Sequence, residues 1–333
     1  MDPIMTFGLL IVSLFIILLS CEFFTNGIEW FGRRLHAGDG VIGSLLSAVG
    51  TCLPETMIPI IAILFVGEKG AVDIGIGAIA GAPFMLGTLA FFITGVSVFA
   101  FSLIRRTGSK MDVDLKLIER DLRYFILAYM MGIGCSFVEE RPLKIAAGIF
   151  LVIVYAYYVY ITVREDEAYY CRLHSLYISK CTGTRPSLAA ICVQLMVALA
   201  GIVLGTSLFV DYLQEAAQML HVRALVLSLI LTPVATELPE KFNSSIWVKR
   251  ERDTLALANI SGAMVFQSCI PVAIGILFTP WKLGEITLFS AVIAITSATV
   301  YLLSMRRSGK VNPAMLLLGG VLYGVFIAFL SVQ

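Results

Sequence analysis

Ala235-Thr236-Glu237-Leu238-Pro239-Glu240 places two carboxylates and a proline inside a long apolar run of the sequence. A second stretch, Gly50-Thr51-Cys52-Leu53-Pro54-Glu55, has the same Thr-x-Leu-Pro-Glu order in an equally apolar setting. The similarity extends back to Leu35-His36 in the first copy and to Leu220-His221 in the second, with identical spacing to the glutamate. Two weak copies this deep in hydrophobic sequence indicate a membrane protein built from two related halves.

The composition of the chain is that of a polytopic membrane protein. Of its 333 residues 59% are apolar and only 14% are charged, which leaves room for about ten membrane-spanning helices of roughly 20 residues each. A net charge of +1 and the lack of a dense basic run give no sign of a nucleic-acid partner. The seven cysteines form neither a CxxC pair nor a Cys/His metal spacing, so we expect them to serve packing, and we expect no cofactor.

Hydropathy, interrupted by polar and Gly/Pro segments, places the individual spans. We expect them near residues 6–31, 40–65, 72–104, 122–139, 143–163, 187–211, 223–248, 254–279, 284–304 and 312–332. The two halves are then residues 1–163 and 187–333, with five spans each, and the polar segment 164–186 is a solvated linker between them.

The basic residues of the loops fall mostly on one side of this arrangement. The opposite loops hold little more than Lys69, Arg141 and Lys282. The positive-inside rule therefore puts both termini outside the cell and the linker in the cytoplasm. Because five spans per half is an odd number, the fold class is predicted to be an all-α polytopic membrane protein with two inverted five-helix repeats. We expect a monomeric protein of the cell membrane, whose partners are the lipid bilayer and small inorganic cations.

The chemistry of the repeated motif follows from its residue types. Proline has no N–H group, so Pro54 and Pro239 are each predicted to break a helix and release a carbonyl oxygen at membrane depth. In each copy the threonine lies four residues before the final glutamate, so hydroxyl and carboxylate share a helix face. An uncompensated carboxylate there would cost roughly 2.5–3.5 kcal/mol on the gentler insertion scale, so a positive partner is expected.

Oxygen ligands without clustered His or Cys select a hard cation, and six or more oxygens suit Ca²⁺ better than Mg²⁺. The alternative is that the carboxylates are satisfied within the protein, for example by Lys241 beside Glu240. Adjacent residues on a helix point about 100° apart, so we favour a bound cation.

The two stretches resemble the alpha-repeats of the calcium/cation antiporter superfamily, most closely those of prokaryotic sodium/calcium exchangers. In that family each repeat begins with Gly-Thr-Ser-Leu-Pro-Glu and continues one helix later with Gly-Asn-x-x-Gly-Ser-Asn-x-x-Asn. The resemblance implies ten helices in two inverted halves, and it implies that Glu55 and Glu240 share Ca²⁺ with the help of Thr51 and Thr236. It further implies export of Ca²⁺, or of a related divalent cation, in exchange for Na⁺ or H⁺ by alternating access, with no catalytic residue.

Departures from the family pattern concern the counter-ion. Residues 258–267 keep Asn259 and Gly262 but have Ala263 and Gln267 where the family has Ser and Asn or Asp, and residues 77–86 keep only the glycines. The serine of the first motif is replaced by Cys52 in one copy and by Glu237 in the other. The family uses these positions chiefly for Na⁺, so the resemblance implies a candidate counter-ion or secondary site at Glu237, Asn259, Gln267 and Cys52.

The identity of the counter-ion stays open between Na⁺ and H⁺. The lost hydroxyls and amides weaken a sodium site, whereas Glu237 near Glu240 favours proton uptake, because two like charges so close resist joint ionisation. Sodium could still bind at Glu55, Glu240, Asn259 and Gln267.

Three other functions are compatible with paired carboxylates. A divalent cation transporter of altered selectivity would no longer use Na⁺. An intramembrane hydrolase could use the carboxylates as acid and base, but hydrolysis does not require a duplicated, inverted motif. A channel does not require inverted halves either. We therefore predict a cation antiporter, not an enzyme.

Overall fold

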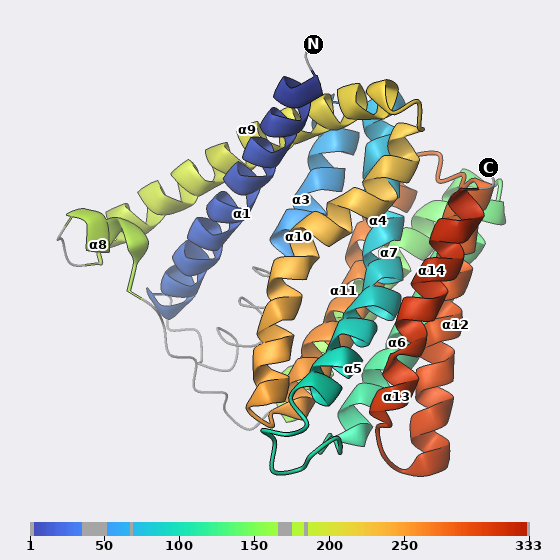
Figure 1. The fold of residues 1–333 in the computed structure, drawn as a ribbon. Helices are drawn as coiled ribbons and strands as arrows, with labels where there is room; N and C mark the ends of the chain where they lie inside the picture. The colour runs from blue at the N-terminus through green and yellow to red at the C-terminus, as the bar shows by residue number, and fades with distance from the viewer. Residues whose placement is uncertain (1–2, 35–51, 67–68, 166–174, 183–185, 332–333) are drawn as a thin grey trace. The chain divides into compact units, whose positions relative to one another are not determined.

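The computed structural model of the chain describes residues 3–34, 52–66, 69–165, 175–182 and 186–331, and every regular element in these ranges is a helix (Figure 1). Within them, seven helical segments are long and apolar enough to cross a membrane. They are Pro3–Phe31, Gly70–Ala100, Arg141–Thr162, Leu188–Met219, Asp253–Phe278, Glu285–Ser308 and Pro313–Leu330. The prediction of an all-α polytopic membrane protein is confirmed.

The chain forms two compact units, and each takes segments from both predicted halves. Unit 1 comprises Met1–Val72 and Ala156–Ala224, and unit 2 comprises Asp73–Tyr155 and Leu225–Gln333. The predicted division at 1–163, 164–186 and 187–333 concerns sequence relatedness rather than contacts, so it stays a prediction.

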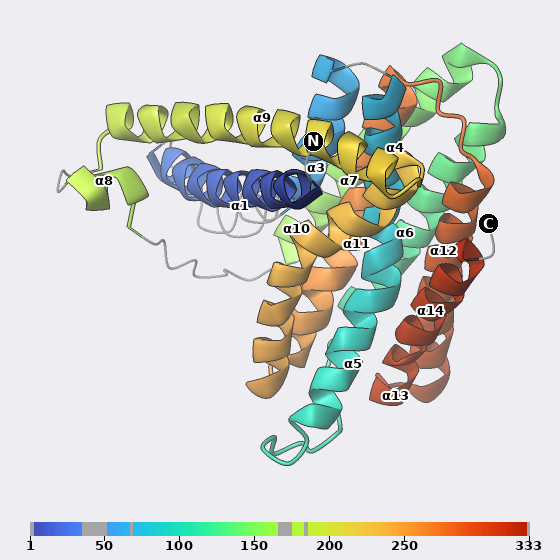
Figure 2. The ribbon, with the colours of Figure 1, turned by 45° about the horizontal axis from the view of Figure 1, so that its top comes forward.

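Unit 1 is built on a pair of long helices, α1 (Pro3–Arg34) and α9 (Leu188–Met219), which lie side by side (Figure 2). The pair is antiparallel, because Gly27 faces Leu195 whereas Ile16 faces Gly205. The helices are in close contact: a methyl group added at Gly201 would lie 2.3 Å from the Ser20 hydroxyl. Small residues at such points let two helix backbones approach each other. The unit also contains α3 (Leu53–Ile61), the π-helical turn η2 (Ala62–Val66) and the short helix α8 (Tyr177–Thr182).

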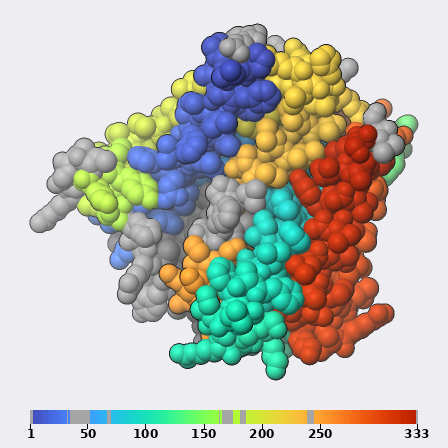
Figure 3. All heavy atoms as spheres, viewed as in Figure 1, coloured from blue at the N-terminus to red at the C-terminus, as the bar shows by residue number. Residues whose placement is uncertain are grey.

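Unit 2 contains most of the remaining helices. They are α4 (Lys69–Met85), the π-helical turn η3 (Leu86–Ala90), α5 (Phe91–Ala100), α6 (Leu115–Gly134), the short η4 (Cys135–Phe137), α7 (Arg141–Glu165), α10 (Ala224–Lys249), α11 (Asp253–Phe278), α12 (Glu285–Ser308), α13 (Pro313–Leu316) and α14 (Leu318–Leu330). The first residues of α4 and the last of α7 belong to unit 1. On one face of unit 2, α5 lies beside the red segment that includes α13 and α14 (Figure 3).

Glycines bring α4 against α10. A methyl group at Gly77 would lie 2.4 Å from the Leu225 carbonyl oxygen, and one at Gly81 would lie 2.1 Å from that of Leu229. No side chain fits there, so glycine at both positions lets α4 and α10 pack closely.

Several helix ends differ from the hydropathy prediction. Helix α6 begins at Leu115 rather than near residue 122, because Asp114 caps it by accepting hydrogen bonds from the Lys116 and Leu117 amides. Helix α9 continues to Met219 rather than ending near residue 211. The linker contains α8, so its described part is not merely a solvated connector. Hydropathy detects the apolar part of a helix and misses polar turns at its ends.

The predicted helix break at Pro239 is wrong, because α10 stays helical from Ala224 to Lys249. A proline removes a single intrahelical hydrogen bond, and the neighbouring turns can bend rather than break; Figure 1 shows α10 changing direction along its length. Pro54 instead lies in the first turn of α3, where an N–H has no helical partner in any case. Residues 35–51 lie outside the described part of the chain.

Candidate cation site

The first motif copy forms the start of α3 in unit 1. Cys52 is the N-cap residue, and its carbonyl oxygen accepts hydrogen bonds from the Thr56 amide at 3.2 Å and the Thr56 hydroxyl at 2.6 Å. Glu55 lies in the first turn with its side chain only 2% exposed. A carboxylate at this end of a helix is stabilised by the unpaired amides and the helix dipole. Thr51 lies outside the described residues.

The second copy lies inside α10 in unit 2. Thr236 and Glu237 are 1% and 2% exposed, so both are buried. The Thr236 hydroxyl donates its hydrogen to the Thr232 carbonyl oxygen at 2.9 Å, which leaves the lone pairs of its oxygen available to a cation. Pro239 and Glu240 belong to α10, but their side chains fall outside the described part of the chain.

A ladder of hydroxyl groups leads along α10 to this copy. Ser228 donates to the Ile74 carbonyl oxygen of α4 at 2.7 Å and lies 3.1 Å from the Thr232 hydroxyl. Ser228, Thr232 and Thr236 are spaced four residues apart, so they share one helix face. Sequence reasoning missed the first two, although their spacing from Thr236 was visible.

Helix α11 supplies the two amide side chains of the second repeat. Asn259 donates to the Ser244 hydroxyl of α10 at 3.5 Å, a long hydrogen bond. Gln267 is 1% exposed, and neither of its amide atoms has a hydrogen-bond partner within the described residues. An unsatisfied buried polar group costs about 1–3 kcal/mol, so this amide is suited to a ligand.

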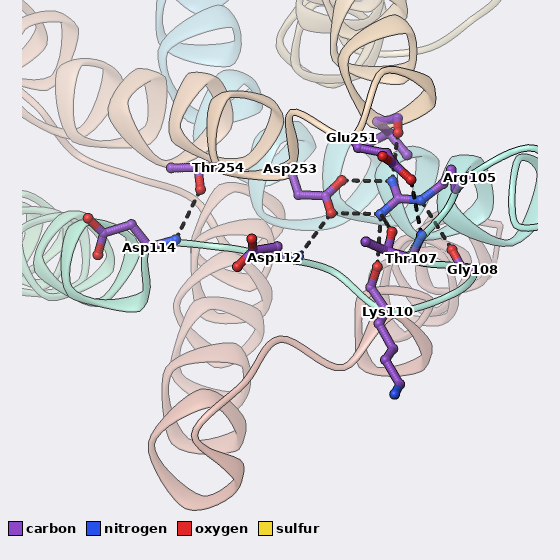
Figure 4. A network of polar contacts seen from close by, with 10 residues as sticks. Arg105, Thr107, Gly108, Lys110, Asp112, Asp114, Glu251, Asp253 and Thr254 are labelled. Atoms are coloured by element: carbon purple, nitrogen blue, oxygen red, sulfur yellow. Dashed lines mark hydrogen bonds and ion pairs between the residues drawn. The ribbon is translucent and has the colours of Figure 1, made fainter.

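The turn between α10 and α11 is held by a buried ion pair (Figure 4). Both terminal nitrogens of Arg105 donate to the Asp253 carboxylate at 2.7 Å. The remaining Arg105 hydrogen bonds go to the Val248, Gly108 and Lys110 carbonyl oxygens and to the Thr107 hydroxyl. The loop that follows α5 is therefore fixed to the hairpin that carries Thr236, Glu237, Asn259 and Gln267.

One further buried carboxylate escaped the sequence analysis. Asp121 of α6 is 2% exposed and accepts a hydrogen bond from the Ser261 hydroxyl of α11 at 2.7 Å. The predicted span began one residue later, which placed Asp121 in a loop. The polar start of α6 hid it from a hydropathy search.

Comparison with known proteins assigns the family. The model of the family described as "Sodium/calcium exchanger protein" matches residues 5–164 and 191–333. The chain belongs to the sodium/calcium exchanger family. This is a family of transporters rather than enzymes, as the resemblance of the motifs implied.

Relatives and solved structures are similar to this exchanger-family chain over most of its length. The chain is 25% identical over 297 residues to an uncharacterized membrane protein of Methanocaldococcus jannaschii, covering 89% of this chain and 88% of the relative. It is 24% identical over 337 residues to the inner membrane protein YrbG of Escherichia coli, covering 97% and 95%. The H⁺/Ca²⁺ exchanger CAX has a similar fold, with a TM-score of 0.71 at 14% identity over 98% of this chain and 81% of that one. The sodium-calcium exchanger NCX_Mj has a TM-score of 0.58 at 23% identity over 98% of each chain.

The predicted site residues of this exchanger-family chain thus fall into two described groups. Pro54 and Glu55 lie in the first turn of α3, with Cys52 as its N-cap. The other group lies on the α10–α11 hairpin and consists of Thr236, Glu237, Asn259 and Gln267. Among the described residues no three His, Cys, Asp or Glu side chains gather into a metal-binding group. The shared binding of one ion by Glu55 and Glu240 stays a prediction.

Proposed function

We propose that this exchanger-family chain is a secondary-active antiporter that exports Ca²⁺, or a related divalent cation, in exchange for Na⁺ or H⁺ by alternating access. The observation that carries the proposal is the doubled Thr-x-Leu-Pro-Glu motif in a chain of the exchanger family. Its described carboxylates, Glu55 and Glu237, are both buried. Buried carboxylates in membrane helices are costly and mark ion pathways.

The proposed ligands of the divalent cation are Glu55 and Glu240, with Thr51 and Thr236 assisting. Two carboxylates supply the charge, and hydroxyl and carbonyl oxygens complete a set suited to a hard cation. The free lone pairs of Thr236 support its role. Glu237, Asn259, Gln267 and Cys52 form the proposed counter-ion or secondary site. The Gln267 amide, which has no hydrogen-bond partner in the described part of the chain, supports this site.

Inverted repeats are supported by the contacts between α1 and α9. Glu55 and Glu240 are 185 positions apart, as are His36 and His221. Adding 185 to positions 16 and 20 gives 201 and 205. In the structure Ile16 contacts Gly205 and Ser20 contacts Gly201. The 185-residue offset pairs position 16 with 201 and position 20 with 205, so it converts each of these contacts into the other. An antiparallel pair related in this way is what a two-fold axis in the membrane plane produces.

Ten crossings are the proposed topology. Three further spans are added to the seven candidate spans in this proposal: α3 together with η2, α6, and α10. Their polar or proline-rich sequence weakens the hydropathy signal. An even number of crossings puts both termini on one side. The sparse basic residues of the loops on that side support its being the outside.

The solved structures that this chain resembles include exchangers of both kinds. One is an H⁺/Ca²⁺ exchanger and the other is a sodium-calcium exchanger. The replacement of hydroxyl and amide positions by Cys52, Ala82, Leu86 and Ala263 supports H⁺, and so does the extra carboxylate of Glu237. A transporter of divalent cations that no longer uses Na⁺ is the corresponding second candidate.

Ion-driven uptake in proteoliposomes tests the proposal. Calcium uptake is measured with an outward sodium gradient at clamped pH, then with an outward proton gradient in sodium-free buffer, then with neither. We expect at least one gradient to drive calcium above its equilibrium level. Flux that only follows the calcium gradient would indicate a channel and would contradict the proposal.

A further inference from the structure

Helix α8 begins with a cap that its own segment does not supply. The Tyr177 amide donates to Asn26 Oδ1 of α1 at 3.2 Å, and the Ile178 amide donates to Gln194 Oε1 of α9 at 3.0 Å. The first amides of a helix have no partner within it, and a helix of six residues is not stable alone in water. The helical state of α8 therefore depends on two side chains from the long pair.

The same two side chains also bind α1 to α9. Gln194 Nε2 donates to Asn26 Oδ1 and to the Phe23 carbonyl oxygen, both at 2.9 Å. Gln194 is fully buried and Asn26 is 4% exposed, so both side chains rely on hydrogen bonds within the protein. Asn26 and Gln194 thus form one node that joins α1, α9 and α8.

Tyr177 holds α8 to the side of α1. Its hydroxyl donates to Glu22 Oε1 at 2.7 Å, and its ring lies against that of Phe23 with centroids 5.1 Å apart. Figures 1 and 2 show α8 at one end of α9. The helix is therefore docked by a side chain and by its capped end.

The repeat does not reproduce the amide of Gln194 at the opposite end of the pair. The 185-residue offset relates Asn26 to Asp211 and Gln194 to Leu9. Leu9 has no polar side chain, so it cannot make the amide contacts that Gln194 makes. The amide contacts of Gln194 are therefore not repeated by the offset, and they occur at the end where α8 docks.

We propose that α8 is a strap that holds α1 and α9 in register, with Asn26 and Gln194 as positioning residues for ion exchange. A shift of α1 along α9 by one helical turn, about 5.4 Å, would break the Asn26–Gln194 bond and uncap α8 at the same time. Docking of α8 and this register of the pair are thus mutually dependent. The consequence for transport rests on the proposed antiport function.

Hydrogen–deuterium exchange of residues 175–182 tests the strap without any transported ion. The full-length protein is compared as wild type, Gln194→Leu, Tyr177→Phe and Gln218→Leu. Gln218 is an exposed residue of the same helix, so its variant is the matched control. We expect the Tyr177 and Ile178 amides to be protected in wild type and control, and to exchange roughly two- to tenfold faster in Tyr177→Phe, the factor that corresponds to one lost hydrogen bond. Gln194→Leu should exchange faster still.

Transport by the same variants tests the consequence. We expect Tyr177→Phe and Gln194→Leu to exchange calcium more slowly at saturation, because the register that positions α1 and α9 for exchange is no longer held. The calcium concentration for half-maximal rate should stay at the wild-type value. Unprotected α8 amides in wild type, equal protection in Gln194→Leu and Gln218→Leu, or unchanged turnover after α8 is released would each overturn the strap. If the α8 amides are protected in the wild-type protein but it transports no cation on any gradient, the antiport function is contradicted. The Asn26–Gln194 node would still be supported by the protection.

Discussion

Arg105 and Asp253 form a two-pronged ion pair at 2.7 Å although their side chains are 0% and 1% exposed. Arg105 precedes α6 and Asp253 begins α11, so the pair joins segments from the two predicted halves. Every hydrogen-bonding nitrogen of the guanidinium has an acceptor, and Asp253 also accepts from the Asp112 amide at 3.0 Å. Such a pair tolerates burial only while both partners are present.

Removing one partner of this pair should destabilise the protein strongly. Arg105→Ala leaves the Asp253 carboxylate buried without its cation, and we expect a loss of about 3–5 kcal/mol in the free energy of unfolding. Arg106→Ala changes the exposed neighbour and should stay within about 0.5 kcal/mol of wild type. Thermal unfolding of the purified protein measures both. Equal unfolding temperatures of the two variants would contradict the assigned geometry.

The contact between α4 and α10 predicts a glycine requirement. Gly81→Ala would push a methyl group to 2.1 Å from the Leu229 carbonyl oxygen, so the helices must separate. We expect a loss of about 1–3 kcal/mol, as for overpacked cores. Gly324→Ala in α14 meets no atom within 4 Å and is the control. A Gly81→Ala protein as stable as the control would show that the helices are not in close contact here.

Glu237 decides between the two counter-ions. If H⁺ is exchanged, Glu237→Gln removes the proton-binding carboxylate and should abolish calcium uptake driven by an outward proton gradient. The flux of wild type and variant is measured in sodium-free proteoliposomes. Uptake driven by sodium alone, and unchanged in the variant, would contradict proton exchange and favour Na⁺.

Orientation in the membrane is predicted from loop charge. A single cysteine placed at Ser175, in a background that lacks the native cysteines, should lie in the cytoplasm. It should react with an impermeant thiol reagent only after the cells are opened. Labelling in intact cells would reverse the proposed topology.

The sequence predicted most helices within a few residues, because long apolar runs in a membrane protein are unambiguous. Helix α11 spans 253–278 where 254–279 was expected. The prediction from sequence failed at Asp121 and at α8, for two different reasons. The first turns of α6 are polar and lie outside the hydropathy signal, although Asp114 was a readable N-cap. Helix α8 is capped by Asn26 and Gln194, which are distant in sequence, so no local pattern could reveal it.

The candidate site shows the same contrast. Repetition identified Glu55 and Glu240 from residue order alone. The hydroxyl ladder of Ser228, Thr232 and Thr236 was visible as a four-residue spacing, but only the structure shows that Ser228 contacts the Ile74 carbonyl oxygen of α4.

Calcium-dependent thermal stabilisation of the Glu55→Gln and Glu240→Gln variants tests whether the two carboxylates share one calcium ion. A ligand present at 100 times its dissociation constant stabilises the folded state by about 2.7 kcal/mol, which a thermal shift detects. Each variant removes one charge at nearly constant shape, so we predict that calcium no longer raises the unfolding temperature of either. The exposed Glu285→Gln variant should keep the full wild-type shift. A wild-type calcium shift in either the Glu55 or the Glu240 variant would contradict a site shared by the two carboxylates.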